Sequence, residues 1–330
     1  MRIKNSMKKF LAAVVSLLLI TGITAKASDL VIESKNQTYH EDNNKIKFNG
    51  NVKVTVDDLK VVGDSADVDV TEDQKLDTAT FYDKPYAFEV KKNKKREVKA
   101  NILKVSLISK IIRAEGDTQS VVFEGKTPVI VINADVQEYD TKTGIMTAAG
   151  SVTMLYKDIE TYSNGAEITT DKNGDLKKLV LTGNAKVKQE NNESYADKFV
   201  YEASTGNLTA YGNTTSNAVM DDGSKLVLKS TYQEYNRKNS VFNASGNVRI
   251  WYQDYYAAGP KVTLYPDSET KKPNEAYFSG RSSITQGVRT IFADKIKMTM
   301  KPKSFDAQGN TRTVIKNLGS GTDDNMTLGL

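Results

Sequence analysis

The sequence predicts an all-β protein made of stacked antiparallel strands. After residue 28, apolar and polar residues alternate with a period of two through most of the chain, as in 52–56 and 296–300. This alternation gives a strand one apolar and one polar face. A glycine-containing segment also recurs every 29 to 34 residues, at Gly150, Gly183, Gly212, Gly246, Gly280 and Gly309. A fixed period of this length indicates a stacked repeat architecture.

The first 27 residues have the features of a Sec-type signal peptide. A positive region precedes an apolar core at 10–23, and Ala-Lys-Ala at 25–27 provides a cleavage site. An uncleaved membrane anchor is the alternative. All five basic residues of this segment would leave with it, so the mature chain would hold 41 basic and 41 acidic residues. That balance does not imply a nucleic-acid partner.

The chain has no cysteine, so stability must come from burial and backbone pairing. Residues 28–316 are predicted to form a single domain of about nine repeat units, and residues 317–330 a flexible tail. The units are expected to begin near Leu30, Gly63, Val98, Asn133, Asn164, Tyr195, Leu226, Pro260 and Thr290.

Two segments depart from the repeat. Residues 82–85 (Tyr-Asp-Lys-Pro) occupy the place where Gly-Asn is expected. Residues 98–114 could form an amphipathic helix, although their Ile and Val content favours strand.

Little in the sequence supports catalysis. His40 is the only histidine, which excludes multi-histidine metal sites and histidine-paired nucleophiles. No metal, cofactor or catalytic residue is predicted, and the protein is not expected to be an enzyme. Stacking could align Asp67, Asp135, Asp197 and Asp294 in a column, but carboxylates that bond nearby backbone explain them more simply. Residues 171–175 resemble a calcium loop only in part and are predicted to be a turn.

Two clusters leave a functional alternative open. The basic run at 91–96 (Lys-Lys-Asn-Lys-Lys-Arg) is either a solvated loop or a contact for anionic lipid phosphates. The aromatic cluster at 251–256 is expected to pack across strands, with a role at a lipid or sugar rim as the alternative.

Apolar residues recur at equivalent repeat positions and alternate correctly to line one interior. The predicted lining residues are Val52, Val54, Val152, Met154, Val187, Phe199, Tyr201, Val248, Ile250, Ile284, Ile296 and Met298. Periodicity does not decide whether this interior is a filled core or a groove open along one edge.

Two segments carry a family resemblance. Residues 195–213, which begin Tyr-Ala-Asp-Lys-Phe-Val-Tyr-Glu and end Ala-Tyr-Gly-Asn, closely resemble the repeat of OstA/LptA-type lipopolysaccharide-transport proteins, and residues 134–152 resemble it too. The resemblance covers about 30–316. It implies an elongated folded β-jellyroll (β-taco), an OstA-like repeat solenoid whose apolar interior holds acyl chains.

The resemblance also implies a function. The chain would be a periplasmic, lipid-binding bridge that carries lipopolysaccharide or a similar amphiphile from the inner to the outer membrane along an apolar groove. Its expected partners are an inner-membrane LptC-like jellyroll and an outer-membrane LptD-like jellyroll, joined by end-strand pairing, with possible head-to-tail self-association. The chain is nearly twice as long as the usual bridge protein. The alternatives are a structural or adhesive secreted β-solenoid with a filled core and, more weakly, a polysaccharide-acting enzyme.

Overall fold

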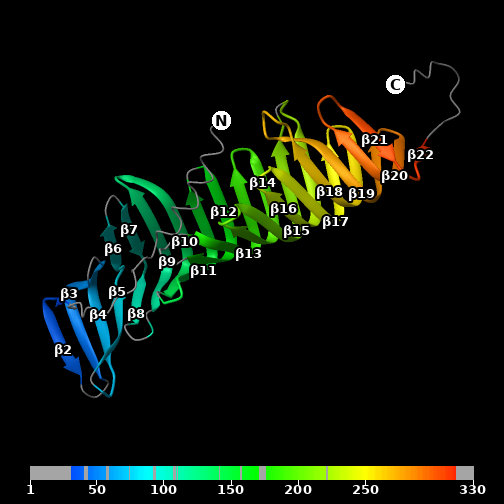
Figure 1. Cartoon of the computed structure of the whole chain (residues 1–330). Helices are drawn as coiled ribbons and strands as arrows, with labels where there is room; N and C mark the ends of the chain where they lie inside the picture. Colours follow the sequence, from blue (N-terminus) through cyan, green and yellow to red (C-terminus); the bar gives the residue numbers. More distant parts are fainter. Residues whose placement is uncertain are drawn as a thin grey trace. The chain divides into compact units, whose positions relative to one another are not determined.

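The computed structural model describes residues 31–316 except for short stretches at 41–43, 57–58, 74, 92–93, 107–108, 110, 141, 157, 171–175 and 221. The described residues are almost entirely β-strand (Figure 1), which confirms the predicted all-β class. None of them lies in a helix long and apolar enough to cross a membrane. The predicted signal peptide, the predicted tail and the turn at 171–175 lie outside the described residues.

The chain divides into two compact units. Unit 1 comprises the described residues up to Thr214 together with Asn236–Lys238, and unit 2 comprises Thr215–Tyr235 and the described residues from Asn239 onward.

The strands that lie wholly in unit 1 are β1 (Val31–Glu33), β2 (Asn36–His40), β3 (Lys45–Val56), β4 (Leu59–Val70), β5 (Leu76–Tyr82), β6 (Tyr86–Lys91), β7 (Lys94–Lys99), β8 (Ile102–Ser106), β9 (Ile111–Glu124), β10 (Thr127–Asp140), β11 (Ile145–Tyr156), β12 (Ile159–Thr170), β13 (Leu176–Gln189) and β14 (Asn192–Glu202). The remaining strands are β15 (Asn207–Val219) and β16 (Lys225–Asn236), which contain the boundary, then β17 (Val241–Tyr252), β18 (Tyr255–Pro266), β19 (Pro273–Gln286), β20 (Arg289–Thr299), β21 (Ser304–Gln308) and β22 (Arg312–Ile315).

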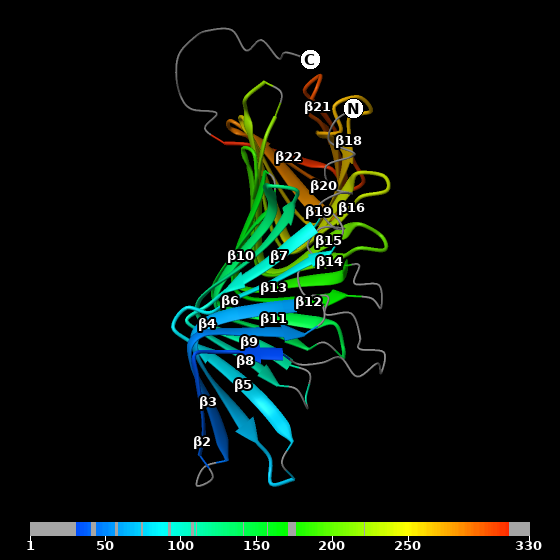
Figure 2. The ribbon, with the colours of Figure 1, turned by 90° about the vertical axis from the view of Figure 1, so that its left-hand side faces the viewer.

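Strands that follow one another in the chain pair antiparallel through most of each unit. In unit 1, β9 to β14 form such a series, visible in both views (Figures 1 and 2). In unit 2, β17 to β20 form another. Only two to six residues separate consecutive strands in each series, which is the spacing expected of a stacked antiparallel repeat.

The recurring glycine marks a bulge inside alternate long strands, among them β3, β9, β11, β13 and β17. In β11, Gly150 has φ +79° and Ser151 has φ +46°, and the register with β12 shifts between Ala149 and Val152. Two consecutive left-handed residues add length to one strand and bend it. Glycine enters the left-handed region freely and asparagine more easily than most residues, which explains the repeated Gly-Asn. The same pair of positive φ values occurs at 50–51, 116–117, 183–184, 212–213, 246–247 and 309–310.

The irregular repeat near residues 77–90 is a long strand divided in two. β5 pairs with β8, whereas the consecutive strands β6 and β7 pair with each other, and each of these two pairs lies between β4 and β9 in the sheet. Asp83 and Lys84, which both have positive φ, make the bend here in place of Gly-Asn. Within the segment 98–114, residues 98–99, 102–106 and 111–114 lie in β7, β8 and β9, so the strand interpretation is confirmed and the helical one is wrong.

Candidate functional site

The inward-facing residues of unit 1 form two walls, one on each side of the bends. Wall A contains two rows in which each residue is the cross-strand partner of the next. The first row is Phe48, Ala66, Phe81, Leu103, Ala114, Gln137, Ala148, Ala166, Leu181 and Phe199. The second row is Ile46, Val68, Ala79, Val105, Ile112, Tyr139, Met146, Ile168, Leu179 and Tyr201. Only Gln137 interrupts these apolar rows.

Wall B, on the other side of the bends, is less uniform. Its main row is Ile32, Val54, Val61, Ala87, Val98, Ser120, Ile132, Met154, Thr161, Val187 and Ser194. Residues of both walls belong to shared buried clusters, for example Met146 and Ile168 of wall A with Met154 and Ile132 of wall B. The walls therefore pack against each other, as in a sheet folded on itself.

Unit 2 has the same kind of interior. One side carries the rows Phe242, Leu264, Ala276, Met298 and Phe305, and Ala244, Val262, Phe278, Ile296 and Ala307. The other side carries Ile250, Ala257, Ile284 and Ile291. Residues of both sides share one buried cluster.

The predicted lining residues all fall on these inward faces. Eleven of the twelve are at most 8% exposed, and Val187 is partly buried against the same cluster. Val52 and Val54 belong to one cluster of unit 1, while Val152, Met154, Phe199 and Tyr201 belong to the other. Val248, Ile250, Ile284, Ile296 and Met298 lie together in unit 2. Their contact with a ligand stays a prediction.

Sequence reasoning missed a buried polar group in wall A. Gln137 is 3% exposed; its Oε1 accepts a hydrogen bond from Ser120 (2.6 Å), and its Nε2 donates to Thr118 Oγ1 (2.8 Å). Thr118 donates in turn to the carbonyl of Ala134 beside the bend (2.7 Å). A bend interrupts the backbone ladder, so side chains satisfy the carbonyls that it frees.

A signal for this group was present in the sequence. Thr-x-Ser at 118–120 and Gln-Glu-Tyr at 137–139 recur 96 residues later, at 214–216 and 233–235. In unit 2, Ser216 donates to Gln233 Oε1 at 2.6 Å, which reproduces the bond between Ser120 and Gln137. This buried polar group therefore recurs once every 96 residues, which is about three repeat units.

Hydroxyls also lie on wall B of β12. Thr161 and Ser163 are 4% and 7% exposed, and Ser163 Oγ has no hydrogen-bond partner. A buried hydroxyl without a partner reduces stability.

The aspartates predicted to share a position do so in part. Asp135 and Asp197 lie against the bend glycine of the following strand, and Asp294 lies against Gly309, directly after β21. Asp67 is instead paired with Lys47 and Thr80 away from any bend. Asn213 donates to Asp197 (3.0 Å) and Asn310 to Asp294 (2.7 Å), so these carboxylates stabilise the bends. Within the described residues, no group of three or more potential ligands could hold a metal ion.

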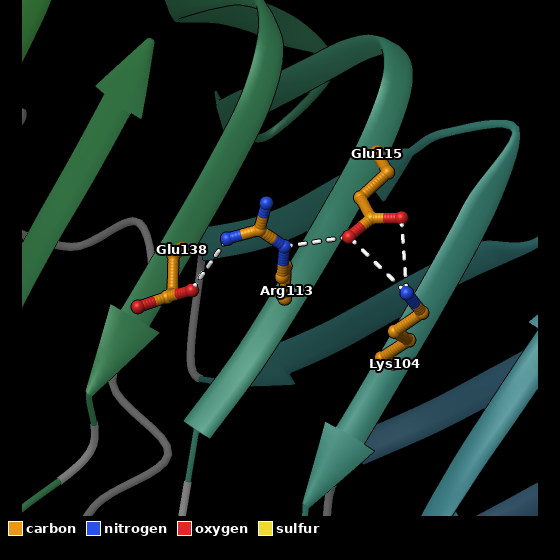
Figure 3. A network of polar contacts seen from close by, with 4 residues as sticks. All are labelled: Lys104, Arg113, Glu115 and Glu138. Atoms are coloured by element: carbon orange, nitrogen blue, oxygen red, sulfur yellow. Dashed lines mark hydrogen bonds and ion pairs between the residues drawn. The ribbon is translucent and has the colours of Figure 1, made fainter.

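An ion-pair network lies among part-buried side chains of β8, β9 and β10 (Figure 3). Glu115 accepts hydrogen bonds from Arg113 Nε (2.6 Å) and from Lys104 Nζ, and Arg113 also donates to Glu138 (2.8 Å). The bonds from Arg113 and Lys104 lower the pKa of Glu115. The network links three neighbouring strands and touches no inward-facing row.

These features define a class of protein: a bent, repetitive β-structure with apolar inward rows and no cluster of catalytic groups among its described residues. Residues 31–126 and 131–233 match the family model described as LptA/(LptD N-terminal domain) LPS transport protein. The match covers more than half of the chain, and the chain therefore belongs to this family of transport proteins, which are not enzymes.

One solved structure with partial similarity is LptH from Pseudomonas aeruginosa, described as the LptA homologous periplasmic component of the conserved lipopolysaccharide transport device. The similarity covers 39% of this chain and 95% of LptH, at 11% sequence identity and a TM-score of 0.34. No curated protein matches the chain.

Proposed function

We propose that this chain is a periplasmic lipid-binding bridge that carries lipopolysaccharide, or a similar amphiphile, from the inner to the outer membrane along its apolar interior. The observation that carries the proposal is the continuity of the inward rows, in which wall A has one polar residue over ten successive cross-strand positions. Family membership and the signal-peptide pattern at 1–27 support transport and the periplasm.

The energetic argument concerns the acyl chains of the cargo. Exposing a chain of about 14 carbons to water costs on the order of 10 kcal/mol, at about 0.8 kcal/mol per CH₂. A row of similar apolar side chains removes most of this cost and offers nearly the same environment at each strand. Cargo could then move along the row without a chemical step, so direction would have to come from a partner that supplies energy.

The lining residues are mostly buried, which limits where an acyl chain can enter the interior. Most lining side chains are already covered by the opposite wall, so an acyl chain can enter only where the walls separate or side chains rearrange. Entry exchanges wall-to-wall contacts for wall-to-lipid contacts, and the apolar surface of the lipid leaves water. Partly buried apolar residues packed against the cluster, such as Val129, Val187 and Leu208, are the first contacts that we expect.

The proposed partners are jellyrolls of the same family that add strands at the chain's ends. In the described part of the chain, β1 and β2 pair with β3 at one end, and β21 and β22 pair with β20 at the other. Strand addition at such edges uses backbone hydrogen bonds. An LptC-like partner, an LptD-like partner and a second copy of the chain are the candidates.

Site-specific photocrosslinking to lipopolysaccharide tests the proposal. A crosslinker at Met154 or Ile250 should capture lipid, because both side chains face the interior. The matched controls are their neighbours Thr153 and Arg249, which the alternation places on the opposite face. A lipid signal restricted to the inward positions supports the groove. If neither inward position captures lipid in the folded protein, the result would contradict the proposal and favour a structural β-solenoid with a filled core.

A further inference from the structure

The positive charge of the chain is concentrated in one hairpin. β6 and β7, with their turn, span residues 86–99 and contain six Lys or Arg residues against two Glu residues. The chain after residue 27 holds 41 basic and 41 acidic residues, so the residues outside this hairpin hold 35 and 39 and are slightly acidic. A local excess of four positive charges is therefore a property of this hairpin and not of the whole surface.

Aromatic rings of β6 hold three ammonium groups on one face: those of Lys95 and Lys99 in this hairpin and that of Lys60 in β4. Tyr86 and Phe88 of β6 stack with their ring centroids 5.3 Å apart. Lys95 Nζ lies 5.7 Å from the centroid of Tyr86 and 5.4 Å from that of Phe88. Lys60 lies over Phe88 (5.9 Å) and Lys99 over Tyr86 (5.8 Å). These cation–π contacts place three charges beside one another.

The outward face of β6 is apolar, unlike the usual outer face of a strand. Ala87 is buried on the inward face, so Tyr86, Phe88 and Val90 alternate onto the opposite face. Val90 is 51% exposed, and Val62, the cross-strand partner of Tyr86, is 39% exposed. Exposed apolar side chains thus lie among the lysines.

One counter-ion lies within the group. Glu97 accepts a hydrogen bond from Tyr86 (2.5 Å) and pairs with Lys95. Burial on its own would raise the pKa of Glu97, but these bonds lower it, so the carboxylate stays charged and offsets part of the charge of Lys95. Lys60 and Lys99 supply the remaining positive charge of this face.

We propose that this basic–aromatic patch, made of Lys60, Val62, Tyr86, Phe88, Val90, Lys95 and Lys99, docks on the phosphate-bearing surface of an anionic lipid membrane. Ammonium groups complement lipid phosphates, and each basic residue near such a surface strengthens binding. Aromatic rings and an exposed valine suit the boundary between head groups and acyl chains. Cations interleaved with exposed apolar side chains fit this boundary better than they fit a purely polar partner.

Vesicle co-sedimentation of the full mature chain tests the proposal. We expect partition onto phosphatidylcholine vesicles that contain phosphatidylglycerol, weaker partition onto pure phosphatidylcholine, and a decrease with added salt. The triple variant K60Q/K95Q/K99Q should weaken partition by about 25- to 125-fold, because about fivefold per lysine gives about 125-fold for three lysines and about 25-fold if Glu97 cancels the charge of Lys95. The single substitution Val90→Asn should weaken the partition that remains at high salt, because salt screens the lysines and the apolar contact then dominates binding.

The control variant K45Q/K178Q/K188Q removes the same number of charges elsewhere in unit 1, from lysines that form ion pairs as Lys95 does with Glu97. It should change partition by much less than the patch variant, and circular dichroism should show all variants folded. Equal loss in the two triple variants, or no preference of the unaltered chain for anionic vesicles, would overturn the proposal. Such a failure would leave the interior crosslinking result untouched, because the patch faces outward.

Discussion

Replacing the bend glycine Gly150 by alanine should strongly destabilise unit 1. Gly150 has φ +79°, and a left-handed conformation costs an alanine about 1–2 kcal/mol. A Cβ atom there would also lie 2.0 Å from Asp135 Oδ2, 2.5 Å from its Cγ and 2.7 Å from its Cβ. The carboxylate can rotate away, but the Cβ of Asp135 moves only with its backbone. Overpacking of this kind costs about 1–3 kcal/mol, so the total is about 2–5 kcal/mol.

Gly125→Ala is the matched control in the same unit. Gly125 also has positive φ (+64°), but no atom lies within 4 Å of the position where its Cβ would be. Its substitution should therefore cost only the conformational part, about 1–2 kcal/mol. Urea denaturation followed by circular dichroism measures both free energies of unfolding. Equal losses for Gly150→Ala and Gly125→Ala would refute the claim that close approach of Asp135 requires glycine at the bend.

A double-mutant cycle sharpens the same test. Asp135→Gly removes the side chain that the new methyl group at position 150 would meet, so it should restore part of the stability that Gly150→Ala loses. Residues in direct contact show coupling energies of about 0.5–3 kcal/mol. Additive losses in the double variant would show that the two side chains do not meet.

Three further predictions concern polar groups. Gln137→Leu should lower the free energy of unfolding by about 1–3 kcal/mol in urea, because Ser120 and Thr118 lose buried partners. Ser163→Ala should leave stability unchanged or raise it, because that hydroxyl has no partner, whereas Ser282→Ala, which loses a 2.6 Å bond to the Gly280 carbonyl, should cost about 1 kcal/mol. The stabilising effect of Glu115 relative to Glu115→Gln should be present at neutral pH and decline as the pH falls below about 4.5, through the lowered folded-state pKa. A pH-independent difference between those two proteins would contradict the role given to Arg113 and Lys104.

The sequence contained most of the information for the strands and bends. Alternation identified the inward residues because a strand places every second side chain on one face. Gly-Asn identified the repeat, but the bends that it forms at positive φ were found only in the structure. The divided strand at 77–90 was not predictable in the same way. Its bend uses Asp83 and Lys84 at positive φ, and neither residue type marks a bend by itself.

The sequence predicted the candidate site only as a set of apolar lining residues. Gln137 was missed because a search for apolar alternation passes over a polar residue at an inward position. Its recurrence at Gln233 became meaningful once the bonds to Ser120 and Ser216 were seen. Pairing between neighbouring strands follows from the repeat, but hydrogen bonds among inward side chains depend on the register at each bend.

The difference between the two walls of unit 1 bears on whether the interior can open. Wall A is apolar except for Gln137, whereas wall B carries inward hydroxyls at Ser120, Thr161 and Ser163. Separating two apolar walls exposes apolar area on both sides, at about 25 cal/mol per Å². The Ser163 hydroxyl, which has no partner among the described residues, would gain water as a hydrogen-bond partner on separation. The Ser120 hydroxyl would instead exchange its bond to Gln137 of wall A for one to water. On the proposed function, acyl chains would replace wall B as the partner of wall A; the Ser163 hydroxyl would weaken closure of the empty interior, whereas the bond between Ser120 and Gln137 would hold the two walls together at one position.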